Sequence, residues 1–400
     1  MTRTFADLGV SPVANAFLSA DQLDRMEPFY PLHAYVCENC LLVQLEEFES
    51  PDRIFNDQYA YFSSYSDSWL AHARQYTDLM IGKLGLNKNS FVVEIASNDG
   101  YLLQYFLQKG IPVLGIEPSS NVAVVAQSKG IESWVTFFTE KLAKELVSKK
   151  GKADLVLGNN VLAHVPALND FVKGLKIVLA DDGVITMEFP HLLSLMRENQ
   201  FDTIYHEHFS YFSFLAVTRI FAAHGLRILD VDRLSTHGGS LRIYAAHDKS
   251  KRWQEQASVP TLLAEERRAG LDQAASYSAF SEQVNKTKRE LLDFLIGAKR
   301  AGKTIVGYGA PAKGNTLLNF CGIRTDFIDY TVDKSPHKQN MFLPGVHIPI
   351  FAPEKIMETK PDYVLILPWN LRDEVVTQMS GISAWGGKFV TPIPQVRVLD

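Results

Sequence analysis

The most informative stretch of this chain is Phe91-Val92-Val93-Glu94-Ile95-Ala96-Ser97-Asn98-Asp99-Gly100. Apolar β-formers, an acidic residue and a tight Ser-Asn-Asp-Gly turn are followed by a helix predicted over residues 101–107. This order predicts a buried parallel strand that ends in a ligand-binding turn, because open α/β sheets bind ligands at the carboxyl ends of their strands. A glycine at position 100 allows the backbone to approach a ligand closely.

A second apolar run, residues 113–116, ends in Glu117, 17 residues after Gly100. A carboxylate at this place can accept hydrogen bonds from both hydroxyls of a ribose. The turn lacks the Gly-x-Gly-x-x-Gly pattern that seats a pyrophosphate at a helix N-terminus. The pattern therefore favours S-adenosylmethionine (SAM), which has a ribose and a sulfonium but no phosphate, over NAD.

Strands and helices alternate around this stretch. A helix is predicted from Leu70, Ala73, Tyr76 and Met80, which are spaced three and four residues apart. Further strands are predicted over residues 113–117, 154–158, 183–189, 226–232, 240–246, 303–308 and 363–367. The alternation predicts an α/β fold, with a Rossmann-like, doubly wound parallel sheet for SAM and a second α/β unit after it.

We expect four segments along the chain. They are a small, turn-rich amino-terminal lobe (1–66), a SAM-binding α/β domain (67–248), a helical connector (249–301) and a carboxyl-terminal α/β domain (302–400). The connector carries mixed-sign runs such as Glu265-Glu266-Arg267-Arg268, which are typical of a solvated helix face.

Composition and charge limit the class of protein. The net charge of −5, from 40 basic and 45 acidic residues, gives no basic field for a nucleic-acid partner. The chain has neither an apolar run long enough for a membrane span nor a secretory signal at its start, so we expect a cytoplasmic protein without a membrane partner. Its partner is expected to be a small-molecule substrate, and its state a monomer or weak dimer.

The densest polar cluster is Tyr205-His206-Glu207-His208-Phe209-Ser210-Tyr211. Burying two imidazoles, a carboxylate and two phenols costs free energy, so such a cluster indicates a functional or structural role. Three interpretations remain open: general acid/base catalysis, a metal site, and a structural hydrogen-bond network. The cluster lacks the His-Glu-x-x-His spacing that places two metal-binding rings on one helix face.

Four other segments carry groups suited to binding. Asn159 to Val165 follows a strand and offers amides, including Asn160, for the cofactor or for turn capping. Tyr59 to Tyr65 is rich in phenols and hydroxyls and is typical of lobe packing as well as of a site. Two further segments contain glycines and can form either oxygen- or phosphate-binding loops or ordinary tight turns. The first is His237-Gly238-Gly239-Ser240-Leu241-Arg242, and the second is Gly307-Tyr308-Gly309 with Lys313 and Asn315.

Cys37 and Cys40 form a Cys-x-x-Cys pair, which is half of a zinc site. A structural zinc site needs four ligands, and the third cysteine, Cys321, is distant in the sequence. The two missing ligands would therefore have to come from His33 or another residue. Ordinary reduced thiols or an incomplete site are the favoured interpretation, and zinc is therefore in doubt.

The motifs taken together resemble the three-domain SAM-dependent sugar C-methyltransferases, which methylate C3 of a dTDP-4-keto-deoxysugar. The resemblance spans nearly the whole chain and includes Leu8-Gly9, Pro12 to Leu18, Cys37 to Leu45, Glu94 to Gly100, Tyr205 to Tyr211, His237 to Arg242 and Gly307 to Asn315. In that family a zinc lobe takes four cysteines, and the first pair is missing here.

The resemblance implies a role for each site residue. His208 is the base at C3, Glu207 orients or charges it, and Tyr59 and Tyr205 hydrogen-bond the substrate or the enolate oxygen. SAM is held by Glu94, Ser97, Asn98, Gly100, Glu117 and Asn160. The nucleotide sugar, expected to be a dTDP-sugar, is contacted by His237, Ser240, Arg242, Lys313 and Asn315.

Three other functions stay open on the sequence alone. A nucleotide-sugar oxidoreductase or epimerase would bind NAD at the Gly307 turn and not SAM. A noncatalytic sugar-nucleotide binding protein would leave the Tyr205 to Tyr211 cluster without a role. A methyltransferase for another ketone-bearing acceptor would share the cofactor site and the base.

Overall fold

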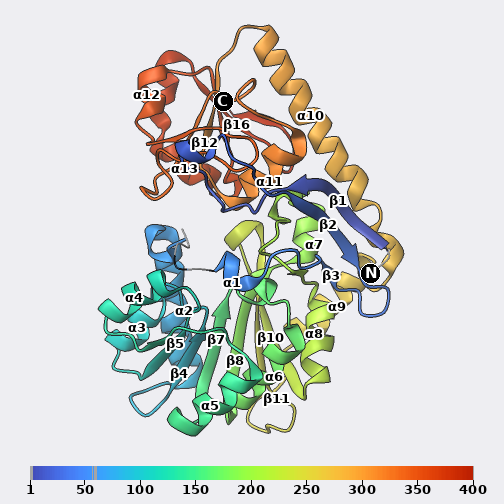
Figure 1. Ribbon diagram of the computed structural model, residues 1–400. Coiled ribbons are helices and arrows are strands. Elements are labelled where there is room, and N and C mark those ends of the chain that lie inside the picture. Colours follow the sequence, from blue (N-terminus) through green and yellow to red (C-terminus); the bar gives the residue numbers. More distant parts are fainter. Residues whose placement is uncertain (1–2, 56, 58–60, 400) are drawn as a thin grey trace.

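The stretch that follows Phe91 forms strand β4 within a seven-stranded sheet (Figure 1). The structure is a computed structural model that describes residues 3–55, 57 and 61–399. The strands of this sheet have the order β6-β5-β4-β7-β8-β11-β10. Their bounds are β4 (Val92–Ile95), β5 (Val113–Ile116), β6 (Ser133–Trp134), β7 (Ala153–Asn159), β8 (Leu179–Pro190), β10 (Leu226–Leu234) and β11 (Ser240–His247).

Strands β4 to β8 are parallel, but β11 runs antiparallel to both β8 and β10. The prediction of a parallel sheet is therefore wrong at this edge. The reason is the short connection between β10 and β11, residues 235–239, because a parallel crossover needs a dozen residues or more.

Helices cover both faces of the seven-stranded sheet, which confirms the predicted doubly wound fold. The predicted helical stripe buries Ala73, Tyr76 and Met80, whereas Leu70 is only half-buried and Trp69 takes its place in the core. One face is covered by α2 (Asp67–Leu84), α3 (Leu103–Gln108) and α4 (Ser120–Ser128). The other is covered by α5 (Glu140–Lys150), α6 (Leu168–Val178), α8 (Phe214–Ala223) and α9 (Ser258–Arg268).

The amino-terminal lobe is more regular than predicted, because it contains a four-stranded antiparallel sheet of order β1-β2-β3-β9. Three strands belong to the lobe, and the fourth, β9, begins two residues after His208 in the sequence. The elements are β1 (Arg3–Ser11), β2 (Tyr30–Val36), β3 (Val43–Gln44), β9 (Ser210–Tyr211) and the short helix α1 (Pro51–Ile54). The base-bearing segment is thus joined to the lobe through a sheet.

The carboxyl-terminal domain contains a six-stranded sheet of order β14-β13-β12-β15-β16-β17, in which only β17 is antiparallel. The strands are β12 (Ile305–Tyr308), β13 (Thr331–Val332), β14 (Ile350–Phe351), β15 (Tyr363–Ile366), β16 (Lys388–Thr391) and β17 (Arg397–Leu399). Its helices are α11 (Ala312–Cys321), α12 (Lys355–Thr359) and α13 (Arg372–Gln378).

The connector packs against its neighbours rather than lying free in solvent. Helix α10 (Phe280–Arg300) buries a stripe that includes Leu291 and Leu295, and it runs beside β1 in Figure 1. Within the charged run of α9, Glu266 is fully buried and accepts 2.7 Å hydrogen bonds from the backbone N–H groups of Phe214 and Leu215. The expectation of a solvated face is therefore wrong for Glu266, which caps helix α8.

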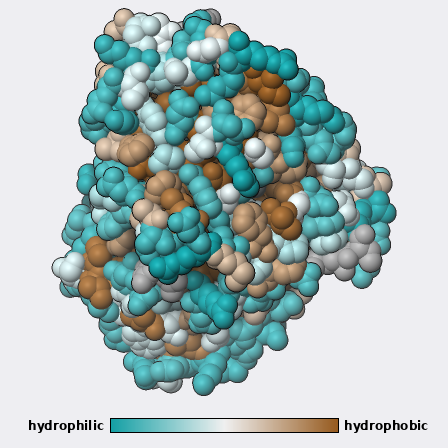
Figure 2. All heavy atoms as spheres, turned by 45° about the horizontal axis from the view of Figure 1, so that its top comes forward, coloured by the Kyte–Doolittle hydropathy of each residue, from teal (hydrophilic) through white to brown (hydrophobic). Residues whose placement is uncertain are grey.

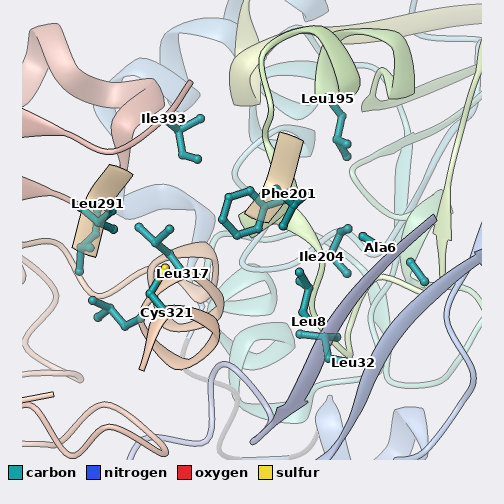
Figure 3. Packing of buried hydrophobic residues seen from close by; sticks show 14 of the residues in the cluster. Ala6, Leu8, Leu32, Leu195, Phe201, Ile204, Leu291, Leu317, Cys321 and Ile393 are labelled. Atoms are coloured by element: carbon teal, nitrogen blue, oxygen red, sulfur yellow. The ribbon is translucent and has the colours of Figure 1, made fainter. Parts of the chain in front are cut away.

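One apolar core is shared by all three parts of the molecule (Figure 3). It brings together Leu8 of β1, Phe201 and Ile204 of the domain that contains the seven-stranded sheet, and Leu317 and Cys321 of α11. Helix α7 (Leu192–Arg197) adds Leu195 to the same cluster. The three parts are therefore held in a fixed relation by side-chain packing.

The surface seen in Figure 2 is largely hydrophilic, with hydrophobic residues gathered in separate patches. Among the described residues, no helix has both the length and the apolar character that crossing a membrane requires.

Candidate active site

A cavity of ≈ 520 Å³ lies where the lobe, the domain of the seven-stranded sheet and the carboxyl-terminal domain meet. Asn15 reaches it from the lobe, Glu117 and His208 from the domain of the seven-stranded sheet, and Lys313 and Asn370 from the carboxyl-terminal domain. The carboxyl ends of β4, β5 and β7 open onto it, which is where an open α/β sheet binds its ligand.

Glu117 stands at the end of β5, as predicted, and lines the cavity. Its two carboxylate oxygens accept hydrogen bonds from the backbone N–H groups of Asn98 (3.0 Å) and Ser119 (2.8 Å). These bonds fix the orientation of the carboxylate, while burial raises its pKa. Asn98 also lines the cavity, and its side chain bonds the backbone of Tyr61 and Ser63, so the turn holds the chain that precedes α2.

Gly100 has a left-handed φ of 74°, and a Cβ there would lie 2.4 Å from the side chain of Ile131. The close approach that requires glycine is therefore made by the chain that follows α4, not by a ligand. Ser97 is fully buried behind the turn, and its hydroxyl lies close to Gly115 of β5. Neither residue lines the cavity.

Buried polar atoms without partners lie at the carboxyl ends of β4 and β7, where these strands meet the cavity. Within the described residues, no hydrogen bond is made by the Glu94 carboxylate, by the Asn159 amide or by the Asn160 side-chain oxygen. Asn159 and Asn160 line the cavity, whereas Glu94 lies just behind it. Unpaired buried groups are costly, so they mark a place prepared for a polar ligand.

His208 is buried and faces the cavity with its contacts well defined. Nδ1 lies 2.9 Å from the carbonyl oxygen of Thr203, which can only accept, so Nδ1 carries the hydrogen. Nε2 is therefore the lone-pair nitrogen, and the Tyr205 hydroxyl donates to it at 2.9 Å. Burial, followed by the neighbouring His164 ring, holds the pKa of His208 well below its usual value. The imidazole is thus neutral at pH 7 and able to accept a proton.

Glu207 lines the same cavity, but it does not form the expected pair with His208 among the described residues. Its carboxylate accepts a 2.6 Å hydrogen bond from the side-chain amide of Asn15. Burial raises the pKa of Glu207 to about 7, and the bond from Asn15 opposes that shift. Glu207 is therefore a second group that can exchange a proton near neutral pH.

Two further histidines face the cavity. The His164 ring lies 4.6 Å from that of His208, and burial lowers its pKa to about 4. His237, predicted to bind substrate, has a left-handed φ of 54°, and burial lowers its pKa to about 4 as well. His164 carried no role in the sequence interpretation because its neighbours Asn159 and Asn160 explained the segment. Tyr59, predicted to contact the substrate, lies outside the described residues.

Lys313 lines the cavity from α11 and donates a 2.8 Å hydrogen bond to Asn370. Burial lowers its pKa, and the charge of Asp202 opposes that shift. Lys338 reaches the cavity from the same domain, and no motif in the sequence pointed to it. The two lysines make this side of the cavity suited to an anionic group.

Three residues predicted to bind substrate do not line the cavity. Ser240 donates to the carbonyl of Thr236, and Asn315 donates to the carbonyl of Ala14. Arg242 is buried and paired with Glu188 through Nε at 2.7 Å. All three hold the fold together instead.

Arg242→Met is expected to lower the free energy of unfolding by about 3 kcal/mol, because it leaves the buried Glu188 carboxylate without its main counter-charge. Chemical denaturation would measure the change, and calorimetry should find the SAM dissociation constant unaltered. The control is Arg372→Met, which removes an exposed arginine paired with Asp373. If the stability were unchanged, Arg242 would not have the structural role described here, and its predicted role in substrate binding would stand.

The Gly307-Tyr308-Gly309 turn does not form a phosphate cradle. The Gly309 N–H donates to the carbonyl of Val332, and the Ala310 N–H donates to the Asp333 carboxylate at 2.7 Å. A Cβ at Gly309 would lie 2.5 Å from Pro368, so tight packing explains the glycine. The occupied amides and the adjacent carboxylate exclude a phosphate from this turn.

Cys37 and Cys40 lie in the turn between β2 and β3. His33 is engaged by Thr4 and Tyr35. Within the described ranges, no cluster of three or more histidine, cysteine, aspartate or glutamate side chains can hold a metal ion. These residues do not fit a zinc site.

Comparisons with known proteins show the family to which the chain belongs. C-methyltransferase NovU of Streptomyces niveus is 37% identical over 392 residues, which cover 98% of this chain and 93% of that protein. The chain belongs to the C-methyltransferase family. Three family models match in order: a putative zinc binding domain over residues 1–55, a methyltransferase domain over 69–231 and a C-methyltransferase C-terminal domain over 235–394.

Solved structures of more distant methyltransferases also align with part of this C-methyltransferase. The 1,6-didemethyltoxoflavin-N1-methyltransferase of Burkholderia thailandensis is 17% identical, with a TM-score of 0.37 over 52% of this chain and 94% of that one. The magnesium protoporphyrin IX methyltransferase of Synechocystis PCC 6803 is 19% identical, with a TM-score of 0.36 over 44% and 83%.

The predicted assignment as a SAM-dependent methyltransferase is confirmed. The residues present fit the cofactor: Glu117 is suited to a ribose, and the unpartnered amide of Asn159 and side-chain oxygen of Asn160 to its other polar groups. When bound, SAM supplies an electrophilic methyl group.

Proposed function

We propose that this C-methyltransferase acts on a nucleotide-linked 4-keto-deoxysugar and methylates the carbon beside the ketone. The observation that carries the proposal is the neutral His208, whose lone-pair nitrogen faces the cavity that Glu117 and Asn160 also line. A carbon beside a ketone can lose a proton to such a base, because the resulting charge moves onto the ketone oxygen. An isolated sugar carbon offers no such route.

His208 takes the proton on Nε2, and the electron pair of the broken C–H bond forms the enolate that accepts the methyl group. The Tyr205 hydroxyl now bonded to Nε2 is displaced by the substrate and turns its hydrogen to the enolate oxygen, together with Tyr59. Lys313 and Lys338 line the carboxyl-terminal side of the cavity and suit the diphosphate of a nucleotide sugar.

The test is an activity assay with SAM and a dTDP-4-keto-deoxysugar, read by mass spectrometry. We expect a singly methylated sugar nucleotide, and a much lower kcat/KM for the same sugar without its nucleotide. Calorimetry with SAM, NAD and dTDP, each alone, should show binding of SAM and dTDP. Methyl transfer to a ketone that carries no nucleotide, with no dTDP binding, would overturn the proposed substrate class.

Asn15→Ala is expected to move the acidic limb of the pH–rate profile to higher pH by about half a unit to one unit. The Asn15 amide stabilises the charged form of Glu207, so its removal raises a pKa that already stands at about 7. Activity that needs the carboxylate would then fall at pH 6.5 and recover at pH 8.5. Asn169→Ala, which removes an exposed amide bonded to His224, is the control. An unmoved limb would show that Glu207 does not act as a charged group.

A further inference from the structure

Asp202 is a fully buried carboxylate that has no place in the proposed chemistry. It lies in the 3₁₀-helix η4 (Phe201–Thr203) of the methyltransferase domain. Its Oδ2 accepts a 2.7 Å hydrogen bond from the indole N–H of Trp369, which belongs to the carboxyl-terminal domain. Oδ1 has no partner among the described residues. A hydrogen bond to a buried carboxylate is strengthened by its charge, so this bond is a strong attachment between the two domains.

The carboxyl-terminal domain holds the same segment at two more points. The hydroxyl of Thr316 in α11 donates a 3.0 Å hydrogen bond to the carbonyl of Ile204. The ring of Phe320 meets that of Phe201 edge-on at 5.4 Å. Figure 3 shows Phe201 and Ile204 with Leu317 of the same helix in one cluster. Residues 201–204 are therefore held in place by polar and apolar contacts from the carboxyl-terminal domain.

This segment also contains the carbonyl that fixes the tautomer of the base. Thr203 lies between Asp202 and Ile204, and its carbonyl oxygen accepts the Nδ1–H of His208 at 2.9 Å. If that carbonyl turned away, the hydrogen could move to Nε2, and the lone pair would no longer face the cavity. We infer that Asp202, held by Trp369, and Thr316 are positioning residues through which the carboxyl-terminal domain keeps His208 in its proton-accepting tautomer.

The charges near this contact agree with the inference. Burial raises the pKa of Asp202 to about 6, and the charge of Lys313 opposes that shift. The carboxylate is therefore ionised above neutral pH, and its charge strengthens the hydrogen bond from the indole of Trp369. The groups that face His208 itself are Tyr205, Tyr211, His164, His237 and Lys313. Neither Trp369 nor Thr316 lines the main cavity. The Trp369 ring also lies 4.6 Å from Nζ of Lys313, and an aromatic replacement at position 369 keeps a ring beside this ammonium group.

The test uses full-length protein with ¹⁵N-labelled histidine, in which the nitrogen shifts report the tautomer of each imidazole. The His208 signals are assigned by their loss in His208→Asn. In Trp369→Phe, which removes the indole hydrogen bond and keeps an aromatic ring, we expect a substantial population of the Nε2–H tautomer. In the methylation assay, kcat should fall about tenfold or more, while the KM for SAM stays within about twofold.

Two further variants make the outcome decisive. Thr316→Val removes the second polar contact with little change of volume and should shift the same signals in the same direction, even where Trp369→Phe folds poorly. Trp385→Phe is the control, because its indole donates to the carbonyl of Pro361 within the carboxyl-terminal domain. Unchanged His208 shifts in both test variants would overturn the inference.

The inference depends on the proposed role of His208, but the two can fail separately. The tautomer is read without any acceptor, so a shift in Trp369→Phe would stand even if the sugar proves to be the wrong substrate. Shifted nitrogen signals with normal kcat would show that His208 is positioned as described but is not the base, and this would sink the proposed function instead.

Discussion

His208→Asn is expected to lower kcat by about 10³-fold and to leave the SAM dissociation constant within about twofold of the parent value. Asparagine keeps a polar side chain of similar reach but has no basic nitrogen. The proton beside the ketone would then remain in place, because among the described residues His208 is the neutral imidazole whose lone pair is fixed toward the cavity. Steady-state kinetics and calorimetry measure the two quantities.

Exchange in deuterated water separates this step from methyl transfer. With S-adenosylhomocysteine in place of the methyl donor, the parent protein should exchange the hydrogen beside the ketone, and His208→Asn should not. His224→Asn provides a matched control, since it changes a histidine that bonds Asn169 away from the cavity. A variant at position 208 that exchanges and turns over at nearly normal rates would remove this residue from the role of base.

Glu117→Gln is expected to weaken SAM binding by about 10- to 100-fold. The carboxylate is aimed by two backbone N–H groups, those of Asn98 and Ser119, and each of its oxygens is used. Glutamine must present its NH₂ group to one of these donors, so the side chain turns and loses bonds to the ribose that are strengthened by charge. Calorimetric titration with SAM measures the change.

Glu132→Gln is the control for this variant, because it alters an exposed carboxylate that pairs with Lys150 in the same domain. Its SAM affinity should equal that of the parent protein. If Glu117→Gln also bound SAM normally, the ribose would have to lie elsewhere in the cavity, and the assignment of the cofactor end would be wrong.

The positions of the first strand, its turn and Glu117 could be predicted because they depend on a local pattern. A buried strand, a turn and an acidic residue at the end of the next strand are neighbours in sequence, and in a parallel sheet they become neighbours in space. The register of β4 with β5 then places Glu94 opposite Gly115 and brings Glu117 beside the turn. The same holds for Tyr205, Glu207 and His208, which a short segment keeps together.

The features that could not be predicted depend on contacts between distant residues. In the amino-terminal lobe, β1 ends next to Pro12 and β2 contains Pro31, while β3 pairs with β9, more than 160 residues later. Glu266 looked solvated because its donors, the amides that begin α8, are distant in sequence. Arg242 looked like a ligand-binding residue for the same reason, since its counter-charge Glu188 lies on another strand.

The placement of β9 bears on how such an enzyme can be divided. The strand begins two residues after His208 and completes a sheet whose other strands come from the start of the chain. Residues 202–204, which precede His208, accept hydrogen bonds from α11 and from Trp369. A fragment limited to the seven-stranded sheet would retain every residue proposed to bind the cofactor. It would lose the lobe strands that pair with β9 and the carboxyl-terminal domain that contacts residues 202–204, and both hold the segment that carries His208. In the proposed mechanism, recognition of the methyl donor therefore needs only the seven-stranded sheet and its turns, whereas deprotonation needs all three parts of the molecule.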